Sequence, residues 1–194
     1  MNQSFSLKSS HHLPLIPQSI VRYERLEFGL SFEKGVRQLV ILAEKGEPRL
    51  APFEGNQSDF EGGTLLLAPL SPANAGALRE LLPWLRPQVL GFQTSAGMGD
   101  RLGLATPGHV RAARKCKGKV APIFAQQSIR ELTRTGRTPQ QVMDDAMWGV
   151  FQENWQDGFG ADADHLKTEA DIDACLAAGF TFFTIDPGEF VNDQ

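Results

Sequence analysis

The segment GFGADADHLKTEADIDACLAAGFTFFTID, residues 158–186, places a helical pattern between two short apolar runs. The runs at 159–168 and 180–186 have the length and composition of buried strands. Thr168 as N-cap and Asp171 at position N3 predict the start of the helix between them. A strand, a helix and a second buried strand are typical of a parallel βαβ unit. The apolar residues that we expect this helix to bury are Ile172, Cys175 and Leu176.

The same alternation begins upstream, at residue 89. We expect strands over 89–95 and 119–128, a helix with Thr106 as its N-cap, and a further helix over 139–155 that opens with a capping box. Four parallel strands make half of a closed eight-stranded barrel, which usually needs about 250 residues. The predicted fold class is therefore α/β, with parallel (β/α) units that resemble the first half of a TIM-like barrel and end before the barrel is complete.

Residues 1–88 follow a different pattern, with compact apolar runs at 37–44 and 63–70 that are bounded by glycine, proline and charge. These runs predict short strands. A short helix is expected after them, with Ser71 as its N-cap and a proline at its first position. We thus predict a β-rich N-terminal region over 1–88, followed by a half-barrel over 89–194 that carries the site residues.

The first 20 residues are expected to form an irregular arm, because their apolar residues and prolines show no stable period. His11 and His12 lie in this arm and are possible metal ligands. Adjacent side chains in an arm point in different directions, so we favour a solvated tail over a metal site.

The composition is typical of a globular protein, since 41% of the 194 residues are hydrophobic and 22% are charged. The net charge of −4 and the scattered basic residues argue against binding to nucleic acid or to an anionic membrane. No apolar run would span a bilayer and no secretory signal pattern is present, so we expect a cytoplasmic protein. Cys116 and Cys175 are expected to be reduced packing residues, because they lie far apart without a CxxC pair.

Reacting groups of parallel α/β proteins gather at the carboxyl ends of strands, where the following loops converge. Asp162, Asp164, His165 and Lys167 come within six residues at the end of a predicted buried strand. Buried ionisable groups are costly unless they are paired, metal-bound or functional. Regular strand alternation would direct Asp164 and His165 to opposite faces of the sheet, whereas a bulge or a strand end would relax this. The other three clusters at strand ends are Gly97–Gly103, Gln126–Ser128 and Asp186–Gly188.

His165 is a suitable ligand for a divalent transition metal, and a neighbouring carboxylate could be a second ligand or a general base. One histidine and some carboxylates do not complete a metal site. The alternative is structural: the aspartates cap the next helix, while His165 and Lys167 form surface ion pairs.

The other clusters keep two interpretations each. The segment GMGDRLG, residues 97–103, lacks the Lys-Ser/Thr of a P-loop and does not match GxGxxG, so phosphate binding is weakly supported. Asp100 and Arg101 either hold a polar substrate or form a turn with a local ion pair. Gln126 and Gln127 either bind sugar hydroxyls or belong to a plain loop.

Two single residues are also ambiguous. Asp186 precedes a proline and is either a turn residue or a site carboxylate. His109 lies in the first turns of a predicted helix, where a cap or packing role is the more common one.

Four long strings of this sequence closely resemble the tagaturonate epimerase family. They are GMGDRLGLATPGH (97–109), FAQQSIRELTRTGRTPQQVMDDAMWGVFQE (124–153), GFGADADHLKT (158–168) and GFTFFTIDPG (179–188). The resemblance covers about residues 89–190, and the earlier residues are similar to the family less distinctively.

This resemblance implies an isomerase of hexuronate catabolism that interconverts D-tagaturonate and D-fructuronate on a barrel-like scaffold with a divalent metal, Zn, Mn or Ni. The family's proton acceptor, an Asp in the string ADADH, corresponds to Asp164, and the metal-binding His after it corresponds to His165. A proton-donating Glu and two further metal-binding His belong to the family's later half and match no residue here, so we expect a truncated form that corresponds to the N-terminal portion of the family. The implied partners are a small sugar acid and either a second copy of the chain or a complementing chain.

Counted from the ketose end, the two sugars differ at C4, a carbon β to the ketone, so simple enolisation does not invert it. A retro-aldol step with re-addition, or a transient oxidation, is needed. We expect the metal to polarise the ketone while Asp164 takes the hydroxyl proton. The alternatives are a metal-dependent aldolase or sugar isomerase, and a catalytically inactive sugar-acid-binding module.

Overall fold

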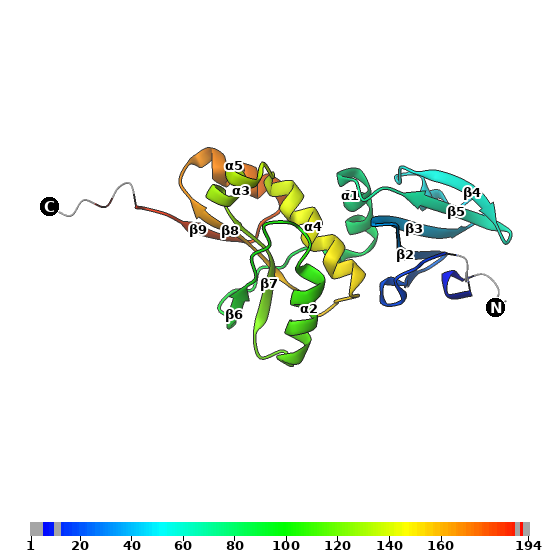
Figure 1. Ribbon diagram of the computed structural model, residues 1–194, viewed down its shortest axis with the longest axis horizontal. Helices are drawn as coiled ribbons and strands as arrows, with labels where there is room; N and C mark the ends of the chain where they lie inside the picture. Colours follow the sequence, from blue (N-terminus) through cyan, green and yellow to red (C-terminus); the bar gives the residue numbers. More distant parts are fainter. Residues whose placement is uncertain (1–5, 10–12, 189–190, 192–194) are drawn as a thin grey trace. The chain divides into compact units, whose positions relative to one another are not determined.

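The computed structural model describes residues 6–9, 13–188 and 191. Two compact units make up the chain (Figure 1). The first unit contains the chain up to Pro83 together with Phe151–Asn154, and the second contains Trp84–Val150 and the chain from Trp155 onward. No helix within these described residues is both long and apolar enough to cross a membrane.

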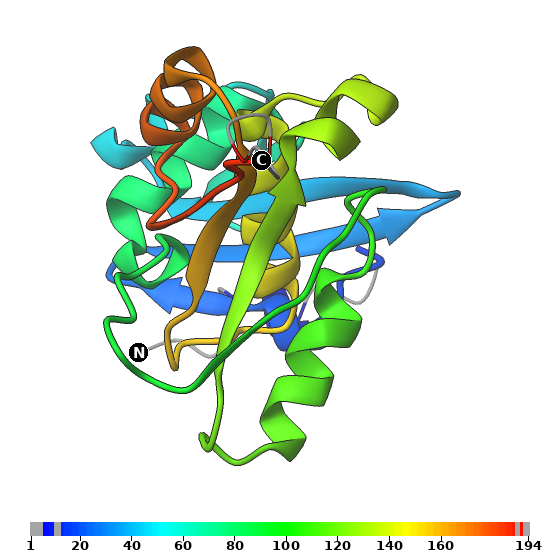
Figure 2. The same cartoon turned by 90° about the vertical axis from the view of Figure 1, so that its left-hand side faces the viewer.

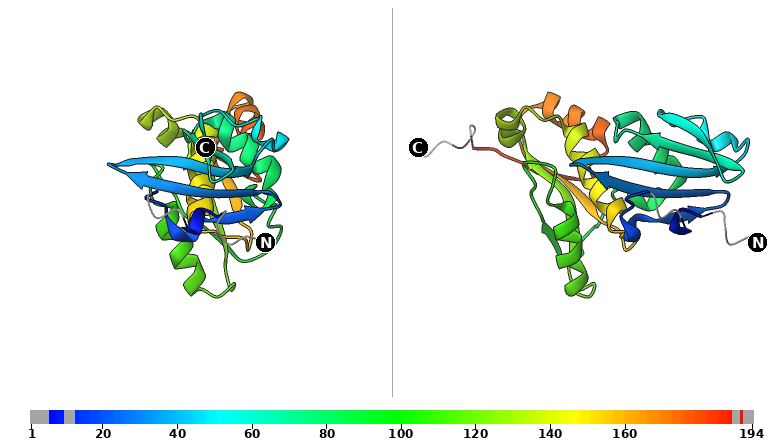
Figure 3. Two further views of the ribbon diagram at one scale, coloured as in Figure 1. Left: turned by 90° about the vertical axis from the view of Figure 1, so that its right-hand side faces the viewer. Right: turned by 45° about the vertical axis from the view of Figure 1, so that its right-hand side comes forward.

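The first unit is built on a five-stranded antiparallel sheet with the order β1-β2-β3-β5-β4 (Figure 3). Two hairpins determine its register. Lys34 and Gly35 join β2 to β3, and both have positive φ, the conformation that a tight two-residue hairpin turn requires. Glu61 and Gly62 join β4 to β5 in the same way. The strands are β1 (Val21–Tyr23), β2 (Leu26–Glu33), β3 (Val36–Glu44), β4 (Asn56–Phe60) and β5 (Gly63–Ala68).

The β-rich character predicted for the N-terminal region is therefore confirmed. The helix α1 (Pro72–Leu81) begins as predicted, because the Ser71 hydroxyl accepts a hydrogen bond from the Asn74 N–H at 3.2 Å. The arm is less irregular than expected, since it contains the short 3-10 helices Leu7–Ser9 and Pro17–Ser19. Leu7 packs in a buried cluster whose other members are Val40, Leu42 and Leu65. His11 and His12 lie outside the described residues.

The second unit contains a four-stranded parallel sheet with the order β6-β7-β8-β9 (Figure 2). Each strand lies beside the next strand of the chain, as in a segment of a (β/α) barrel, so the predicted α/β half-barrel is confirmed. The strands are β6 (Ser95–Gly97), β7 (Ala121–Ser128), β8 (Gly160–Leu166) and β9 (Phe182–Ile185). The helices are α2 (Thr106–Lys115), α3 (Ile129–Thr135), α4 (Pro139–Gln152) and α5 (Glu169–Ala178). Of the remaining 3-10 helices, Pro48–Leu50 belongs to the first unit and Pro83–Leu85 lies at the junction of the two units along the chain.

Aromatic packing organises the interior of the second unit. The ring centroid of Phe124 on β7 lies 5.8 Å from the ring centroids of both Trp155 and Phe159. The Trp155 indole N–H donates to the Gly158 carbonyl at 2.7 Å, so its polar atom is satisfied inside the core. Trp155 and Phe159 come just before β8 in the sequence, so these contacts position the start of the strand that carries Asp164 and His165.

The helix boundaries test the predicted caps. The capping box of α5 is confirmed: the Thr168 hydroxyl accepts from the Asp171 N–H at 3.2 Å, and the Asp171 carboxylate accepts from the Thr168 N–H at 3.1 Å. The box that opens α4 is confirmed as well, between Thr138 and Gln141. However, α4 ends at Gln152 and not at residue 155, because the chain turns at Asn154, which has positive φ.

Three other boundary predictions were wrong. The first parallel strand is short and late, at Ser95–Gly97 in place of 89–95, because the run before it turns at Gly91, which has φ +58°. The N-cap of α2 is Ala105, and Thr106 is instead a buried first residue of the helix. The helix α3 was not expected at all.

Burial differs from the expectation at two helices of the second unit. Leu176 on α5 is 55% exposed, whereas Cys175 is buried as predicted and Ile172 is half-buried. Both cysteines are free thiols, but Cys116 is exposed and is therefore not a packing residue.

Close packing of α4 against α2 requires a glycine. A Cβ built on Gly149 would lie 2.5 Å from the Cβ of Thr106. We predict that Gly149→Ala lowers the free energy of unfolding by about 1–3 kcal/mol through overpacking, as measured by urea unfolding followed by tryptophan fluorescence. The control is Gly108→Ala on α2, where an added Cβ meets no atom within 4 Å and stability should be unchanged or higher. Equal stability of Gly149→Ala and the wild type would contradict this.

The two thiols should differ in reactivity. Burial, with a smaller contribution from Asp171, raises the pKa of the Cys175 thiol to about 11. At pH 8 a thiol of that pKa is only about 0.1% thiolate, the reactive form. We predict that Ellman's reagent modifies one thiol rapidly in the native protein and the second only after denaturation. Cys116→Ser should abolish the rapid phase, and a rapid phase that survives this substitution would show the assignment to be wrong.

Candidate functional site

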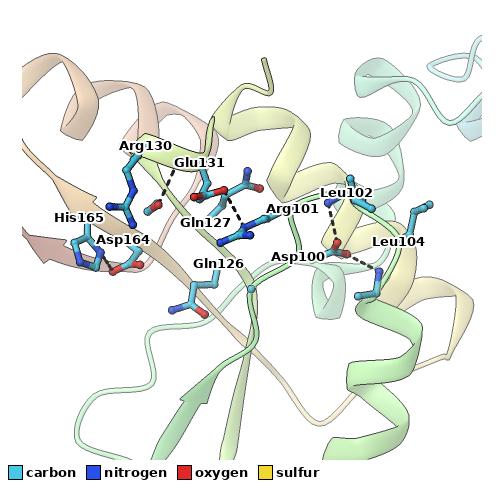
Figure 4. A pocket seen from close by; sticks show the side chains of 13 residues that line it. Asp100, Arg101, Leu102, Leu104, Gln126, Gln127, Arg130, Glu131, Asp164 and His165 are labelled. Atoms are coloured by element: carbon cyan, nitrogen blue, oxygen red, sulfur yellow. Dashed lines mark hydrogen bonds and ion pairs between the residues drawn. The ribbon is translucent and has the colours of Figure 1, made fainter. Parts of the chain in front are cut away.

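A pocket of about 860 Å³ lies at the carboxyl end of the parallel sheet (Figure 4). Three of the four strand-end clusters identified in the sequence contribute to it. These are the loop after β6, the end of β7 with the start of α3, and the end of β8. The lining side chains are those of Asp100, Arg101, Leu102, Leu104, Ala105, Gln126, Gln127, Ser128, Arg130, Glu131, Asp164 and His165.

Asp164 and His165 lie in contact at this pocket. The Nδ1 atom of His165 is 2.7 Å from Oδ1 of Asp164, with the imidazole 56% exposed and the carboxylate side chain 23% exposed. The alternation that would separate them is interrupted, because His165 has φ +57° and the pairing of β8 with β9 shifts register between Ala163 and Leu166. The alternation expected of a regular strand therefore does not apply here, because β8 has the kind of irregularity that relaxes it.

Asp162 is buried below the pocket and is held by the two neighbouring strands. Its carboxylate accepts hydrogen bonds from Nε2 of Gln126 on β7 at 3.1 Å and from Oγ1 of Thr184 on β9 at 3.2 Å. Burial, foremost, raises the pKa of Asp162, and the nearby charge of Asp164 acts in the same direction, whereas the two hydrogen bonds oppose the shift. Asp162 thus ties the three strands together and does not line the pocket.

Gln126 occupies space that a glycine provides. A Cβ built on Gly97 of β6 would lie 2.5 Å from both terminal atoms of the Gln126 side chain. Gln126 lines the pocket and bonds Asp162, so it combines a structural contact with exposure to a ligand. Gln127 is structural: it is buried, donates to Thr135 at 3.2 Å and accepts from Arg137 at 2.7 Å.

Asp100 and Arg101 do not act as a pair. Asp100 accepts hydrogen bonds from backbone N–H groups of its own loop, among them Gly103 at 2.9 Å and Ala105 at 2.6 Å. Arg101 reaches across the pocket instead, with Nε 2.8 Å from Oε2 of Glu131. The other oxygen of Glu131 is 2.8 Å from Arg134, so two guanidinium groups hold this nearly buried carboxylate.

A second hollow, of about 470 Å³, adjoins His165 on the side of the fourth strand-end cluster. Asp186 from that cluster lines it, with Oδ2 3.9 Å from Nζ of Lys167. This spacing agrees with the surface ion pairing weighed for Lys167. The full lining consists of Ile129, Arg130, Thr133, Arg134, His165, Lys167 and Asp186.

His165 is the candidate metal ligand at this pocket. Within the described residues, no group of three or more His, Cys, Asp or Glu side chains is placed to hold a metal ion. His165 nevertheless has the arrangement of a metal ligand, because a carboxylate contacts Nδ1 and leaves Nε2 available. His109 does not approach this pair; its partly buried side chain has an Nδ1 atom without a hydrogen-bond partner among the described residues.

Sequence reasoning missed the contribution of α3, which places Arg130 and Glu131 on the pocket. The signal was present as Ser-x-x-Glu, the pattern of a capping box. The Ser128 hydroxyl accepts from the Glu131 N–H at 3.3 Å, and Gly136 ends the helix in the left-handed conformation. The charged residues between these caps concealed the helix, because they show no apolar period.

The backbone bonds to Asp100 predict a pH-dependent contribution to stability. Burial acts to raise the pKa of Asp100, but four backbone N–H donors outweigh it, so the pKa is lowered from its ordinary value of 3.8. A lowered pKa means that this carboxylate stabilises the fold above about pH 4 and that the contribution is lost as the pH falls through the folded-state pKa.

We therefore predict that Asp100→Asn lowers the free energy of unfolding at pH 7 by about 1 kcal/mol. The difference from the wild type should shrink when the same urea titrations are repeated at pH 3 to 4. Asp173→Asn, an exposed substitution on α5, controls for the loss of one negative charge. A difference that stays constant across this pH range would be incompatible with the assigned role.

Comparison with known proteins identifies the chain's relatives. A model of the tagaturonate epimerase family matches residues 16–194. The tagaturonate/fructuronate epimerase of Thermotoga maritima is 44% identical over 170 residues, which cover 88% of this chain and 34% of that protein.

Solved structures of the same family are also similar to this chain. The crystal structure of fructuronate-tagaturonate epimerase from Cohnella laeviribosi with one glycerol has a TM-score of 0.85 and 38% identity, covering 96% of this chain and 36% of its own. Its native form has a TM-score of 0.84 and 38% identity, with 95% and 36% covered. The chain thus spans about a third of the length of the relatives it matches. Because the family model matches nearly the whole sequence, as the resemblance of its motifs predicted, the chain belongs to the tagaturonate epimerase family.

Proposed function

We propose that this chain contributes the proton acceptor and one metal ligand to an enzyme that interconverts D-tagaturonate and D-fructuronate. The observation that carries the proposal is the contact of 2.7 Å between Asp164 and His165 at the carboxyl end of β8, beside a pocket of about 860 Å³. Family membership supports the choice of sugars, since the Thermotoga and Cohnella relatives are epimerases of tagaturonate and fructuronate.

Asp164 is suited to accept a proton from a substrate hydroxyl. Only its Oδ1 atom contacts His165, and within the described part of the chain its second oxygen has no recorded hydrogen bond. In the retro-aldol route, Asp164 takes the proton of the C4 hydroxyl, the C3–C4 bond breaks, and its electron pair moves to the enolate of the former ketone. The bond then re-forms on the opposite face of the C4 carbonyl, and Asp164 returns the proton. This sequence balances without an external oxidant or reductant.

His165 would hold a divalent cation, Zn, Mn or Ni, through its Nε2 atom. Such a cation supplies Lewis-acid polarisation of the substrate ketone. Asp164 orients the imidazole through Nδ1. Further ligands would come from a second copy of the chain or from a complementing polypeptide, and we place the reaction in the cytoplasm as a step of hexuronate catabolism.

We predict that Asp164→Asn lowers turnover by about 10²- to 10⁴-fold, the usual loss when a positioned acid–base group is removed. The measurement is the interconversion of the two sugars, followed by NMR with added Mn, Ni or Zn. Asp173→Asn on the exposed side of α5 is the matched control and should keep full activity. An Asp164→Asn enzyme that retains most of its turnover would refute the role of this residue.

The same assay separates the proposal from its alternatives. An aldolase would release two fragments, and a binding module would bind the sugar acid without turnover. Absence of interconversion by the wild type with every metal, both alone and mixed with a complementing fragment of an active relative, would overturn the proposed function; the intact relative is the control.

A further inference from the structure

The two hollows at the carboxyl end of the sheet share two side chains. Arg130 and His165 line both the larger pocket and the second hollow of about 470 Å³. Figure 4 shows the Arg130 side chain extending toward the pair formed by Asp164 and His165. A ligand bound at His165 therefore has Arg130 within the same continuous space.

The three arginines of this region differ in whether they pair with a carboxylate. Arg101 and Arg134 each contact one oxygen of Glu131, at 2.8 Å in both cases. Arg130 lies on the same short helix but forms no ion pair or hydrogen bond with any side chain of the described residues. Its guanidinium is exposed and is available for a ligand.

The second hollow has the charge expected of a site for an anion. Three permanently cationic side chains line it, against a single carboxylate. That carboxylate, Asp186, lies 3.9 Å from Lys167, which leaves Arg130 as the cation nearest to the Asp164–His165 pair without an acidic partner in the described chain.

We propose that Arg130 binds the carboxylate of the sugar acid and selects a hexuronate over the neutral ketohexose. The inference rests on the proposed function and specifies how its substrate is recognised. The two kinds of sugar differ at C6, where one has a carboxylate and the other a hydroxymethyl group. The planar guanidinium donates two parallel N–H groups to a carboxylate, whereas a hydroxymethyl group accepts at one oxygen and carries no charge.

The orientation follows from the groups already assigned. With the ketone end at His165 and the C4 hydroxyl at Asp164, we place the C6 carboxylate at Arg130, which lines the same pocket as these two residues. The same contact would hold the C4–C6 fragment while the C3–C4 bond is open. Arg130 is thus a specificity residue that touches substrate remote from the reacting carbon.

The test is a binding measurement on the intact chain. Isothermal titration calorimetry with D-tagaturonate and with D-tagatose, at one fixed Mn concentration, compares the wild type with Arg130→Gln and Lys115→Gln. We expect Arg130→Gln to weaken tagaturonate binding at least tenfold and to change tagatose binding less than twofold. Lys115→Gln is the control, since it removes an exposed cation at the end of α2 that lines neither hollow; its effect should stay below threefold.

Three results would overturn the inference while leaving the proposed function intact. They are unchanged tagaturonate affinity in Arg130→Gln, equal losses for the two sugars, and equal losses for the two variants, which would indicate a diffuse positive potential. A wild-type chain that binds neither sugar would overturn the proposed function and this inference with it. Circular dichroism of each variant excludes unfolding as the cause of a loss.

Discussion

The buried carboxylate of Asp162 is the interaction on which the candidate site depends. A charge in the interior of a parallel sheet is tolerated only when hydrogen bonds replace the lost water. Gln126 and Thr184 supply these bonds from the strands on either side, so one side chain joins β7, β8 and β9. Gly97 leaves room for Gln126, which brings the loop after β6 against the same three strands.

The irregularity at His165 brings two consecutive side chains to the pocket at the end of the sheet. A residue other than glycine in the left-handed region costs about 1–3 kcal/mol and persists only where the surroundings impose it. Here it lies where the pairing of β8 with β9 shifts register, and the result is that consecutive residues, Asp164 and His165, reach one pocket. A carboxylate that both contacts an imidazole and faces a ligand is the arrangement that proton transfer beside a metal requires.

The helix α3 supplies the charge selectivity of this edge. It is only seven residues long and owes its position to its caps, Ser128 and Gly136. Glu131 forms ion pairs with two arginines of the region, whereas the third, Arg130, is left for an anion. In the proposed site, the sheet positions Asp164 and His165, and the helix provides the group that would recognise a sugar acid.

The sequence by itself determined the α/β half-barrel, the capped starts of α4 and α5 and the place of the ADADH string at the end of a strand, because burial period, caps and strand ends are local properties. Only the tertiary structure decided that Asp164 and His165 share a face and that Arg101 pairs with Glu131 and not with Asp100. It also decided that Leu176 is exposed and that the first parallel strand is short. These features depend on strand register and on contacts between distant segments, which no local pattern encodes.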